Sequence, residues 1–311
     1  MKFGIMTGAR SRSADVNDIG RTTTIDETVA LARRAEAAGF ANLWMANVFS
    51  LDAIMTMAIA GRETTRIEVG TAVTPTYPRH PTAIAQQAVT AAAATGNRFV
   101  LGIGLAHKVM IEDALGLSYA RPARHMKEYL EVLAPLLRGE LVDYDGEQYR
   151  VHGLSVGAAG AGEVPVIVAA LGERMLELAG RYTAGTITWM VGPRTLSEHI
   201  VPAIGSAARG AGRATPRVVA GFPIVLTTAV DEARAKIAQA LAVYGELPSY
   251  RAMLDREGVA GPADLALVGD EATLRDAIAR IRDAGATDFN AAIAETDAGA
   301  FDRTFDFLAS L

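Results

Sequence analysis

Two histidines stand beside apolar, strand-like runs and could carry chemistry. His107 follows the glycine-rich end of the run Arg98–Leu105, and His80 lies in the polar, proline-rich loop after the run Ile67–Thr74. A histidine can deliver or accept a proton near neutral pH. We therefore expect acid–base catalysis at His107, with a surface-loop histidine, or one that only contacts a phosphate, as the alternative. His80 is instead expected to cap the following helix or to touch a ligand.

Other reactive side chains are scarce or badly spaced. The chain has no cysteine, which excludes disulfides, thiolate catalysis and cysteine-ligated zinc. None of its five histidines has a histidine partner at metal-ligand spacing, so no metal site is predicted. Lys108 and Glu295 are the main charged residues near run ends, which is too few for a Schiff-base enzyme or a glycosidase. Such a site fits an enzyme whose bound cofactor supplies the reactivity.

Eight apolar runs alternate with helical patterns along the chain. The runs are nearly continuous rather than alternating, which is typical of a parallel sheet covered by helices. Eight such units close naturally into an α/β fold of the (β/α)8 TIM barrel type, with an open doubly wound sheet as the alternative. The runs are Phe3–Thr7, Asn42–Asn47, Ile67–Thr74, Arg98–Leu105, Pro165–Leu171, Thr186–Val191, Val218–Thr228 and Asp288–Ile293.

The helices between these runs carry recognisable end signals. Thr24-Ile-Asp-Glu27 reads as a capping box, and Ser50 is placed to cap the second helix. The alternation is interrupted by insertions after strands 4 and 7. The first is a hairpin signal within Leu141–Val151, and the second contains the helical segments Ser249–Glu257 and Asp270–Ala284. We expect residues 1–311 to form a single domain.

Composition narrows the range of partners and locations. Half of the residues are hydrophobic and the net charge is −5, so a large core is expected and nucleic acid is not an expected partner. The N-terminus enters a strand pattern directly, without a signal peptide, and no apolar segment is long enough to span a bilayer. These features predict a cytoplasmic protein with no membrane partner.

A barrel places its site where the strands end. Enzymes with this fold bind their ligands at the C-terminal ends of the strands. Here that edge is rich in Thr, Asn, Gly, Trp and Met: Thr7, Asn47, Ala72–Thr76, Gly104–Lys108, Ala169–Gly172, Trp189–Gly192, Pro223–Thr227 and Ala294–Thr296.

Several of these segments together resemble the bacterial luciferase-like flavin-dependent oxidoreductase superfamily. The resemblance runs over essentially the whole chain and rests on the order and spacing of Gly70-Thr-Ala-Val-Thr-Pro-Thr76, Gly102-Ile-Gly-Leu-Ala-His107, Gly139-Glu, Asp143-Tyr-Asp-Gly146 and Gly269-Asp-Glu. Within the superfamily the chain is most similar to the actinobacterial branch that uses the deazaflavin coenzyme F420. The motifs for this branch are Gly104-Leu-Ala-His-Lys, Gly116-Leu-Ser-Tyr and Arg121-Pro-Ala-Arg.

The resemblance implies roles for the residues after the third strand. The Ala72–Val73 peptide bond is expected to be cis and to face the central ring of the cofactor. Thr74 and Thr76 are expected to donate hydrogen bonds to the cofactor. Asn47 stands where deazaflavin-dependent relatives carry an Asp-His pair, so the acid–base role of that histidine does not transfer. As a second catalytic candidate, Asn47 could hydrogen-bond the ring.

The resemblance also implies cofactor and substrate contacts elsewhere at the C-terminal ends of the strands. The cofactor phosphate is expected at the backbone of Ala170, Leu171 and Gly172, where a strand turns into a helix. Trp189 and Met190 are expected to wall the substrate pocket, although a core tryptophan would explain the first equally well. The remaining expected cofactor contacts are Thr7, His80, Gly104 and His107.

The predicted function is hydride transfer between C5 of coenzyme F420 and a small organic substrate. The alternatives are an FMN-dependent luciferase-like monooxygenase, a barrel that binds cofactor without turnover, and a metal-dependent hydrolase. A homodimer is expected, since the Ala-rich second and third helices would suit an interface.

Overall fold

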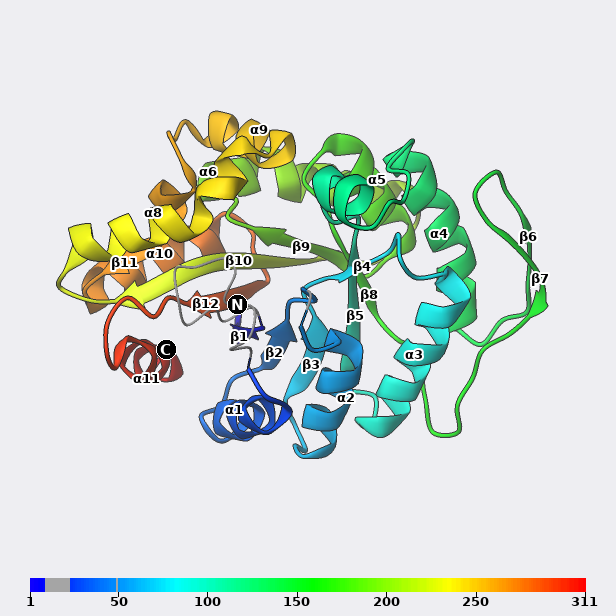
Figure 1. Cartoon of the computed structure of the whole chain (residues 1–311), viewed down its shortest axis with the longest axis horizontal. Coiled ribbons are helices and arrows are strands. Elements are labelled where there is room, and N and C mark those ends of the chain that lie inside the picture. The colour runs from blue at the N-terminus through cyan, green and yellow to red at the C-terminus, as the bar shows by residue number, and fades with distance from the viewer. Residues whose placement is uncertain (9–22, 49) are drawn as a thin grey trace.

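Parallel strands pair around a closed ring in the computed structural model, which describes residues 1–8, 23–48 and 50–311 (Figure 1). β10 pairs with both β9 and β12, and β12 pairs with β1, which closes the sheet. The predicted (β/α)8 TIM barrel is therefore confirmed. Within the described ranges its eight strands are β1 (Lys2–Thr7), β2 (Asn42–Met45), β3 (Glu68–Thr71), β5 (Phe99–Gly104), β8 (Val166–Ala169), β9 (Gly185–Trp189), β10 (Arg217–Leu226) and β12 (Asp288–Ile293).

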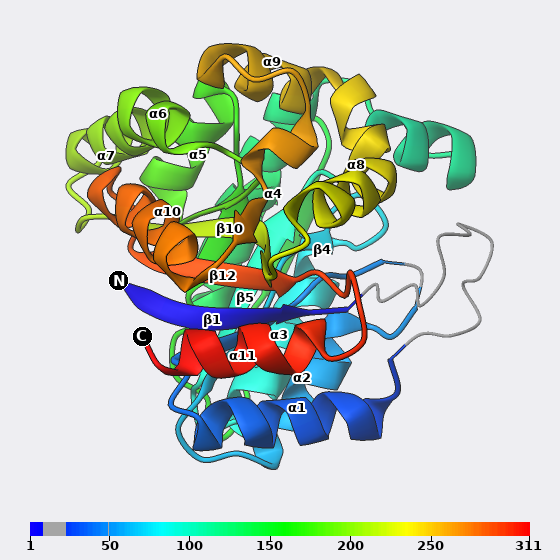
Figure 2. The ribbon, with the colours of Figure 1, turned by 90° about the vertical axis from the view of Figure 1, so that its left-hand side faces the viewer.

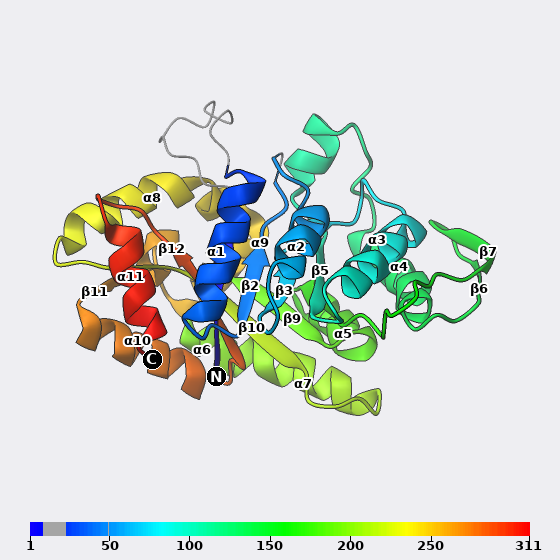
Figure 3. The ribbon, with the colours of Figure 1, turned by 90° about the horizontal axis from the view of Figure 1, so that it is seen from below.

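Helices cover the outside of the ring (Figures 1 and 3). The capping box predicted at Thr24 and Glu27 is confirmed at the start of the first helix. The second helix is capped by Asp52 and not by Ser50, because the Asp52 carboxylate accepts the Met55 N–H at 2.9 Å. The longer helices are α1 (Ile25–Ala37), α2 (Ala53–Arg62), α3 (Pro81–Ala94), α4 (Pro122–Leu137), α5 (Glu173–Tyr182), α7 (Val201–Gly210), α8 (Val230–Glu246), α9 (Pro248–Glu257), α10 (Glu271–Asp283) and α11 (Ala300–Ala309).

Further short elements interrupt the alternation. The three-residue strand β11 was not predicted, and it pairs with the far end of β10, where that long strand has left its pairing with β9. No helix of the described residues is long and apolar enough to cross a membrane. The other elements are β4 (Thr74–Pro75), η1 (Met110–Ala114), the antiparallel hairpin β6 (Val142–Asp145) and β7 (Arg150–Leu154), α6 (Pro193–Thr195), η2 (Leu196–Ile200) and η3 (Pro262–Leu265).

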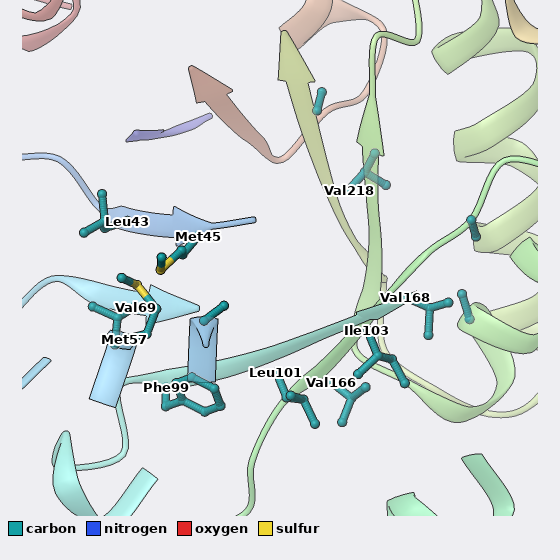
Figure 4. Close-up of a cluster of buried hydrophobic side chains, with 14 of the residues drawn as sticks. Leu43, Met45, Met57, Val69, Phe99, Leu101, Ile103, Val166, Val168 and Val218 are labelled. Atoms are coloured by element: carbon teal, nitrogen blue, oxygen red, sulfur yellow. The ribbon is translucent and has the colours of Figure 1, made fainter. Parts of the chain in front are cut away.

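The strands separate two apolar cores. Side chains such as Leu43, Leu101 and Val168 point outward and pack beneath the helices (Figure 4). The alternate positions point into the ring, where Trp44 and Val219 belong to a smaller interior cluster. The N- and C-termini lie near each other at one end of the barrel (Figures 1 and 2). Both faces of the sheet are thus covered, as the continuous apolar runs predicted.

An ionic network fills the N-terminal end of the barrel. Arg217 pairs with Asp288 at 2.6 Å and with Glu68 at 2.7 Å, and each of the three is the first residue of its strand. Asn42 donates to Asp288 at 3.1 Å and accepts from the Trp44 indole at 2.7 Å. Burial alone would lower the pKa of Arg217, but its bonds to the two carboxylates outweigh burial and raise it. This end of the barrel is therefore filled by the protein itself.

Candidate active site

The opposite, C-terminal end of the barrel has a floor of small side chains. Ala72, Val73 and Ala169 pack on the interior cluster but stay half-buried, whereas Ile167 one layer below is fully buried. Gly104 completes this floor. A Cβ atom at Gly104 would lie 2.7 Å from Cγ2 of Val73 and 3.2 Å from Cβ of Ala169. These small side chains form the floor of the C-terminal end of the barrel.

The Ala72–Val73 peptide bond in this floor is cis, so the prediction made for it is confirmed. The chain then joins the sheet again as β4, whose Thr74 pairs with Ile103 of β5. Thr71 holds the two strands together just below, because its hydroxyl donates to the Gly102 carbonyl at 2.7 Å. The backbone of residues 72 and 73 is thus supported from beneath by β5.

The threonines predicted to bind cofactor differ in what their hydroxyls do. Thr7 and Thr74 are buried, and their hydroxyls have no hydrogen-bond partner within the described part of the chain. Thr76 is equally buried, but its hydroxyl donates to the Gly104 carbonyl at 3.3 Å and contacts His125 at 2.8 Å. Buried polar groups are normally paired. Thr7 and Thr74 are therefore available to a ligand, while Thr76 is engaged inside the protein.

Asn47 and His80 each accept a backbone N–H from the first turn of a helix. The Asn47 side-chain oxygen accepts the Ala53 N–H at 3.1 Å, which leaves its NH₂ group to face a ligand. His80 caps α3, as expected, because its Nδ1 accepts the Thr82 N–H at 3.3 Å. Burial lowers the pKa of His80, which suits an accepting, neutral ring.

His107 is half-buried just beyond the end of β5. Neither ring nitrogen makes a hydrogen bond to any residue in the described ranges. Burial lowers the pKa of His107, so the ring is neutral at pH 7. The rings of Tyr244 and Tyr250 flank it, with centroids 6.2 and 5.9 Å away. A neutral imidazole with free nitrogens is equipped to take a proton.

A column of stacked rings supports the loop that carries His107. The Tyr119 hydroxyl donates to the carbonyl of Ala106, at 3.4 Å, and Ala106 itself has a left-handed backbone with φ 57°. The Tyr119 ring stacks on Tyr77 at 5.1 Å, and Tyr77 stacks on His125 at 3.9 Å. The loop before His107 is thus anchored to α4 through three rings.

His125 at the base of this column was not predicted as a functional residue. Thr76 gives its hydroxyl proton to Gly104, so His125 donates from Nε2 to Thr76 and accepts at Nδ1 from the Tyr149 hydroxyl, 3.2 Å away. Burial lowers the pKa of His125 to about 4. Its partners lie 49 and 24 residues away in the chain, and nothing local in the sequence reveals the cluster.

Neutral His125 should make the fold sensitive to acid. Between pH 6.5 and 4 the unfolded chain binds a proton that the folded chain does not, so the unfolding free energy falls as pH falls. We expect a loss of about 2 kcal/mol between pH 7 and 5 from this residue. Urea unfolding at both pH values measures it, and His125→Gln should remove that part of the slope. The exposed His152→Gln is the matched control, and an unchanged slope in His125→Gln would contradict the prediction.

The turn predicted to bind phosphate has free backbone donors. β8 ends at Ala169, Ala170 is buried, and Gly172 is the N-cap of α5. The N–H groups of Leu171 and Gly172 bond to no described residue. The Leu171 carbonyl accepts from His199 Nε2 at 2.7 Å, a support that sequence reasoning missed. Free N–H groups at a helix N-terminus suit an anion.

Trp189 and Met190 end β9 in different environments. Trp189 is half-buried and lies close to Gly221 on the interior of the barrel. Met190 is only 1% exposed, has a left-handed backbone with φ 52°, and packs on Leu254 of α9. Trp189 therefore offers a surface at the mouth, whereas Met190 joins the mouth to the insertion after β10. No group of acidic or histidine side chains in the described ranges is arranged to hold a metal ion.

Comparison with known proteins gives consistent results. Residues 1–288 match the sequence model of a family described as luciferase-like monooxygenase. The chain is 31% identical over 240 residues to a 5,10-methylenetetrahydromethanopterin reductase of Methanolobus tindarius, covering 76% of this chain and 72% of that protein. It is 34% identical over 164 residues to an F420-dependent glucose-6-phosphate dehydrogenase of Mycobacterium leprae, covering 50% of this chain and 48% of that protein.

A solved structure shows the same fold. The coenzyme F420-dependent tetrahydromethanopterin reductase from Methanopyrus kandleri superimposes with a TM-score of 0.80, covering 99% of this chain and 97% of the other. The two sequences are 20% identical, so this likeness concerns the fold alone.

Proposed function

Because the chain belongs to the luciferase-like monooxygenase family, we propose that it is a coenzyme F420-dependent oxidoreductase. It transfers a hydride between C5 of the deazaflavin and a small organic substrate. Relatives named as F420-dependent enzymes support this cofactor. The observation that carries the proposal is the floor of small residues at Ala72, Val73 and Gly104, half-buried at the first two, together with the buried hydroxyls of Thr7 and Thr74, unpaired within the described ranges, at the same end of the barrel.

The residues of the mouth fit the parts of such a cofactor. The ring would lie on Ala72, Val73 and Gly104, with the hydroxyls of Thr7 and Thr74 as hydrogen-bond partners. The phosphate would meet the free N–H groups at residues 171 and 172. The cofactor supplies the hydride chemistry, and the protein supplies orientation and one proton-transfer group.

The proton-transfer group is His107. Its ring nitrogens are free of described partners and its imidazole is neutral, so it can accept the hydroxyl proton of an alcohol as a hydride leaves the same carbon. It returns that proton in the reverse direction. Asn47 stays a candidate for orienting the ring through its NH₂ group.

Titration with both cofactors tests the proposal. Coenzyme F420 should bind in the micromolar range or tighter, and FMN should bind more weakly. Tight FMN binding with no affinity for F420 would instead favour the monooxygenase alternative. Cofactor binding without turnover of any alcohol, aldehyde, enone or imine would favour the non-catalytic alternative.

Gly104→Val should weaken cofactor binding by displacing the floor. A Cβ atom at this position would lie 2.7 Å from Cγ2 of Val73, so Val73 has to shift and the floor shifts with it. We expect cofactor affinity to fall by about 100-fold, as judged by fluorescence titration. Gly157→Ala is the control, because its Cβ would meet no atom within 4 Å. Unchanged affinity in Gly104→Val would place the ring elsewhere.

We also propose a homodimer that uses α2 and α3, which lie side by side on one face (Figure 3). Met55 and Ile59, four residues apart on α2, are 66% and 36% exposed. Met55→Lys should shift the protein toward the 32.7 kDa mass of one chain, measured by light scattering. Leu141→Lys, at a 68% exposed apolar position away from these helices, should leave the dimer intact. A monomeric wild-type protein would contradict the proposal.

A further inference from the structure

A cavity lies outside the ring of strands, between α6, the end of α9 and α10. Its volume is about 410 Å³, which is within the range of about 300–1,000 Å³ that is usual for small-molecule sites. The elements that enclose it, which also include η3 and β11, gather on one side of the barrel (Figures 1 and 2). The cavity therefore has the size of a ligand site, and every residue that lines it is described by the structure.

This cavity is separate from the proposed cofactor site. Phe222 of β10 lines it and points outward, because it belongs to the core beneath the helices, where its ring centroid is 6.2 Å from that of Phe289. Val219, three residues earlier on β10, belongs instead to the interior cluster on which Ala72 and Val73 pack. None of the residues predicted to bind cofactor or substrate lines the cavity. The two sites thus lie on opposite faces of the sheet.

Most of the cavity wall is apolar. Leu274 and Ile281 of α10 are fully buried, and Ala277 between them is only 7% exposed. Leu265 of η3 and Val268 of β11 add further buried apolar surface. Such a wall suits the hydrocarbon part of a ligand.

Two arginines that line the cavity have no acidic partner among the described residues. Arg234 of α8 is half-buried, and its guanidinium group donates only to the carbonyl of Ala263, at 3.2 Å. Arg280, in the last turn of α10, makes no hydrogen bond or ion pair with any described residue. A guanidinium group that is partly withdrawn from water is stabilised by an anion, and its N–H groups match the two oxygens of a carboxylate.

The other charged groups of the lining are already engaged. The two carboxylate oxygens of Glu257 accept backbone N–H groups at the start of α6, at 3.2 and 2.7 Å. The Asp264 carboxylate accepts the backbone N–H of the N-cap of η3 at 2.9 Å. The guanidinium group of Arg194 bonds to Glu198, which lies outside the lining, at 3.2 Å. The two arginines without an acidic partner are therefore the charged groups left to a ligand.

We propose that this cavity is a second ligand site, which binds an amphipathic carboxylate. The hydrocarbon part of the ligand lies on Leu274, Ala277 and Ile281, and its carboxylate pairs with Arg234 and Arg280. This proposal does not depend on the cofactor proposed above, because the two sites share no residue.

Calorimetric titration with octanoate and with octan-1-ol tests the site. The two molecules have the same chain length, but only octanoate carries a negative charge. We expect one octanoate to bind per chain, with a dissociation constant about tenfold lower than that of octan-1-ol. Equal affinities for the two molecules, or no binding of octanoate, would overturn the proposal.

Variants assign the binding to the cavity. Arg234→Gln and Arg280→Gln should each weaken octanoate binding about tenfold and leave octan-1-ol binding unchanged. Arg213→Gln is the matched control, because Arg213 is exposed and lies outside the lining. Ala277→Phe should fill the cavity and abolish the binding of both molecules, and the arginine variants decide the question if this variant does not fold. Unchanged octanoate affinity in the double variant of Arg234 and Arg280 would contradict the proposal.

The same titration in the presence of coenzyme F420 distinguishes the cavity from the mouth of the barrel. Octanoate should bind equally well whether or not the cofactor is bound. If the cofactor displaces octanoate, the fatty acid occupies the mouth and the cavity proposal is wrong. If F420 does not bind while octanoate binds and responds to the arginine variants, the cofactor assignment is wrong and the second ligand site stands.

Discussion

His107→Gln is expected to lower kcat by about 100- to 10,000-fold, the usual effect of removing a general acid or base. Glutamine keeps a polar side chain of similar reach but cannot exchange a proton. The cofactor dissociation constant should change little, because the floor and the phosphate turn are untouched. Stopped-flow reduction of bound coenzyme F420 by an alcohol that the wild-type protein oxidises measures the loss at the hydride step.

The lowered pKa of His107 also predicts how the rate of alcohol oxidation depends on pH. Burial lowers the pKa of His107, so the neutral base predominates at neutral pH. Alcohol oxidation should therefore be constant at neutral pH and fall only as pH drops through that lowered pKa, and His107→Gln should lose this limb. Among the described residues, the rings that flank His107 are those of Tyr244 and Tyr250, which stay protonated over this range because burial raises the pKa of each. Lys108→Gln is the control, and equal losses in both variants would argue against a base at His107.

Arg217→Met should cost about 3–5 kcal/mol of unfolding free energy. Asp288 is 1% exposed and would keep its buried negative charge without the guanidinium that now holds it at 2.6 and 2.9 Å. Urea unfolding at pH 7 measures the loss. Asp288→Asn placed in the Arg217→Met background should recover part of it, because the uncompensated charge is then removed.

An exposed ion pair provides the comparison. Arg303 and Asp297 pair at 2.9 Å, with 43% and 42% of their side chains exposed, so Arg303→Met should cost less than about 1 kcal/mol. A similar, small loss in Arg217→Met would show that the network at the barrel's base adds little to stability.

The sequence predicted best those strands and helix ends whose pattern lies within a single short segment of the chain. The eight apolar runs predicted the barrel strands, and Thr24 with Glu27 predicted a complete capping box. Ser50 was the wrong cap because Asp52, two residues later, supplies a carboxylate at the required position. β11 was not predicted, because three residues are too few for a periodic pattern and its pairing depends on the extension of β10.

Contacts between distant segments could not be predicted in the same way. His125 has no motif around it. Its role is visible only in the folded chain, where the hairpin places Tyr149 at one ring nitrogen and the loop after β4 places Thr76 at the other. The same is true of Arg217 and Asp288, which are 71 residues apart. The cis bond at Ala72–Val73 was predicted from family resemblance, since no local pattern specifies it.

The path from Tyr149 through His125 to Thr76 has a consequence for how this chain can evolve. Each of the three side chains satisfies a hydrogen bond of the next, and Thr76 passes the last one to the Gly104 carbonyl. A change at one position leaves a buried partner unsatisfied, so it is tolerated best when the others change with it. The three positions should therefore covary among descendants of this gene, although they lie on a loop, a helix and a hairpin. The hairpin is far from the floor in the sequence, but these hydrogen bonds make the two change together.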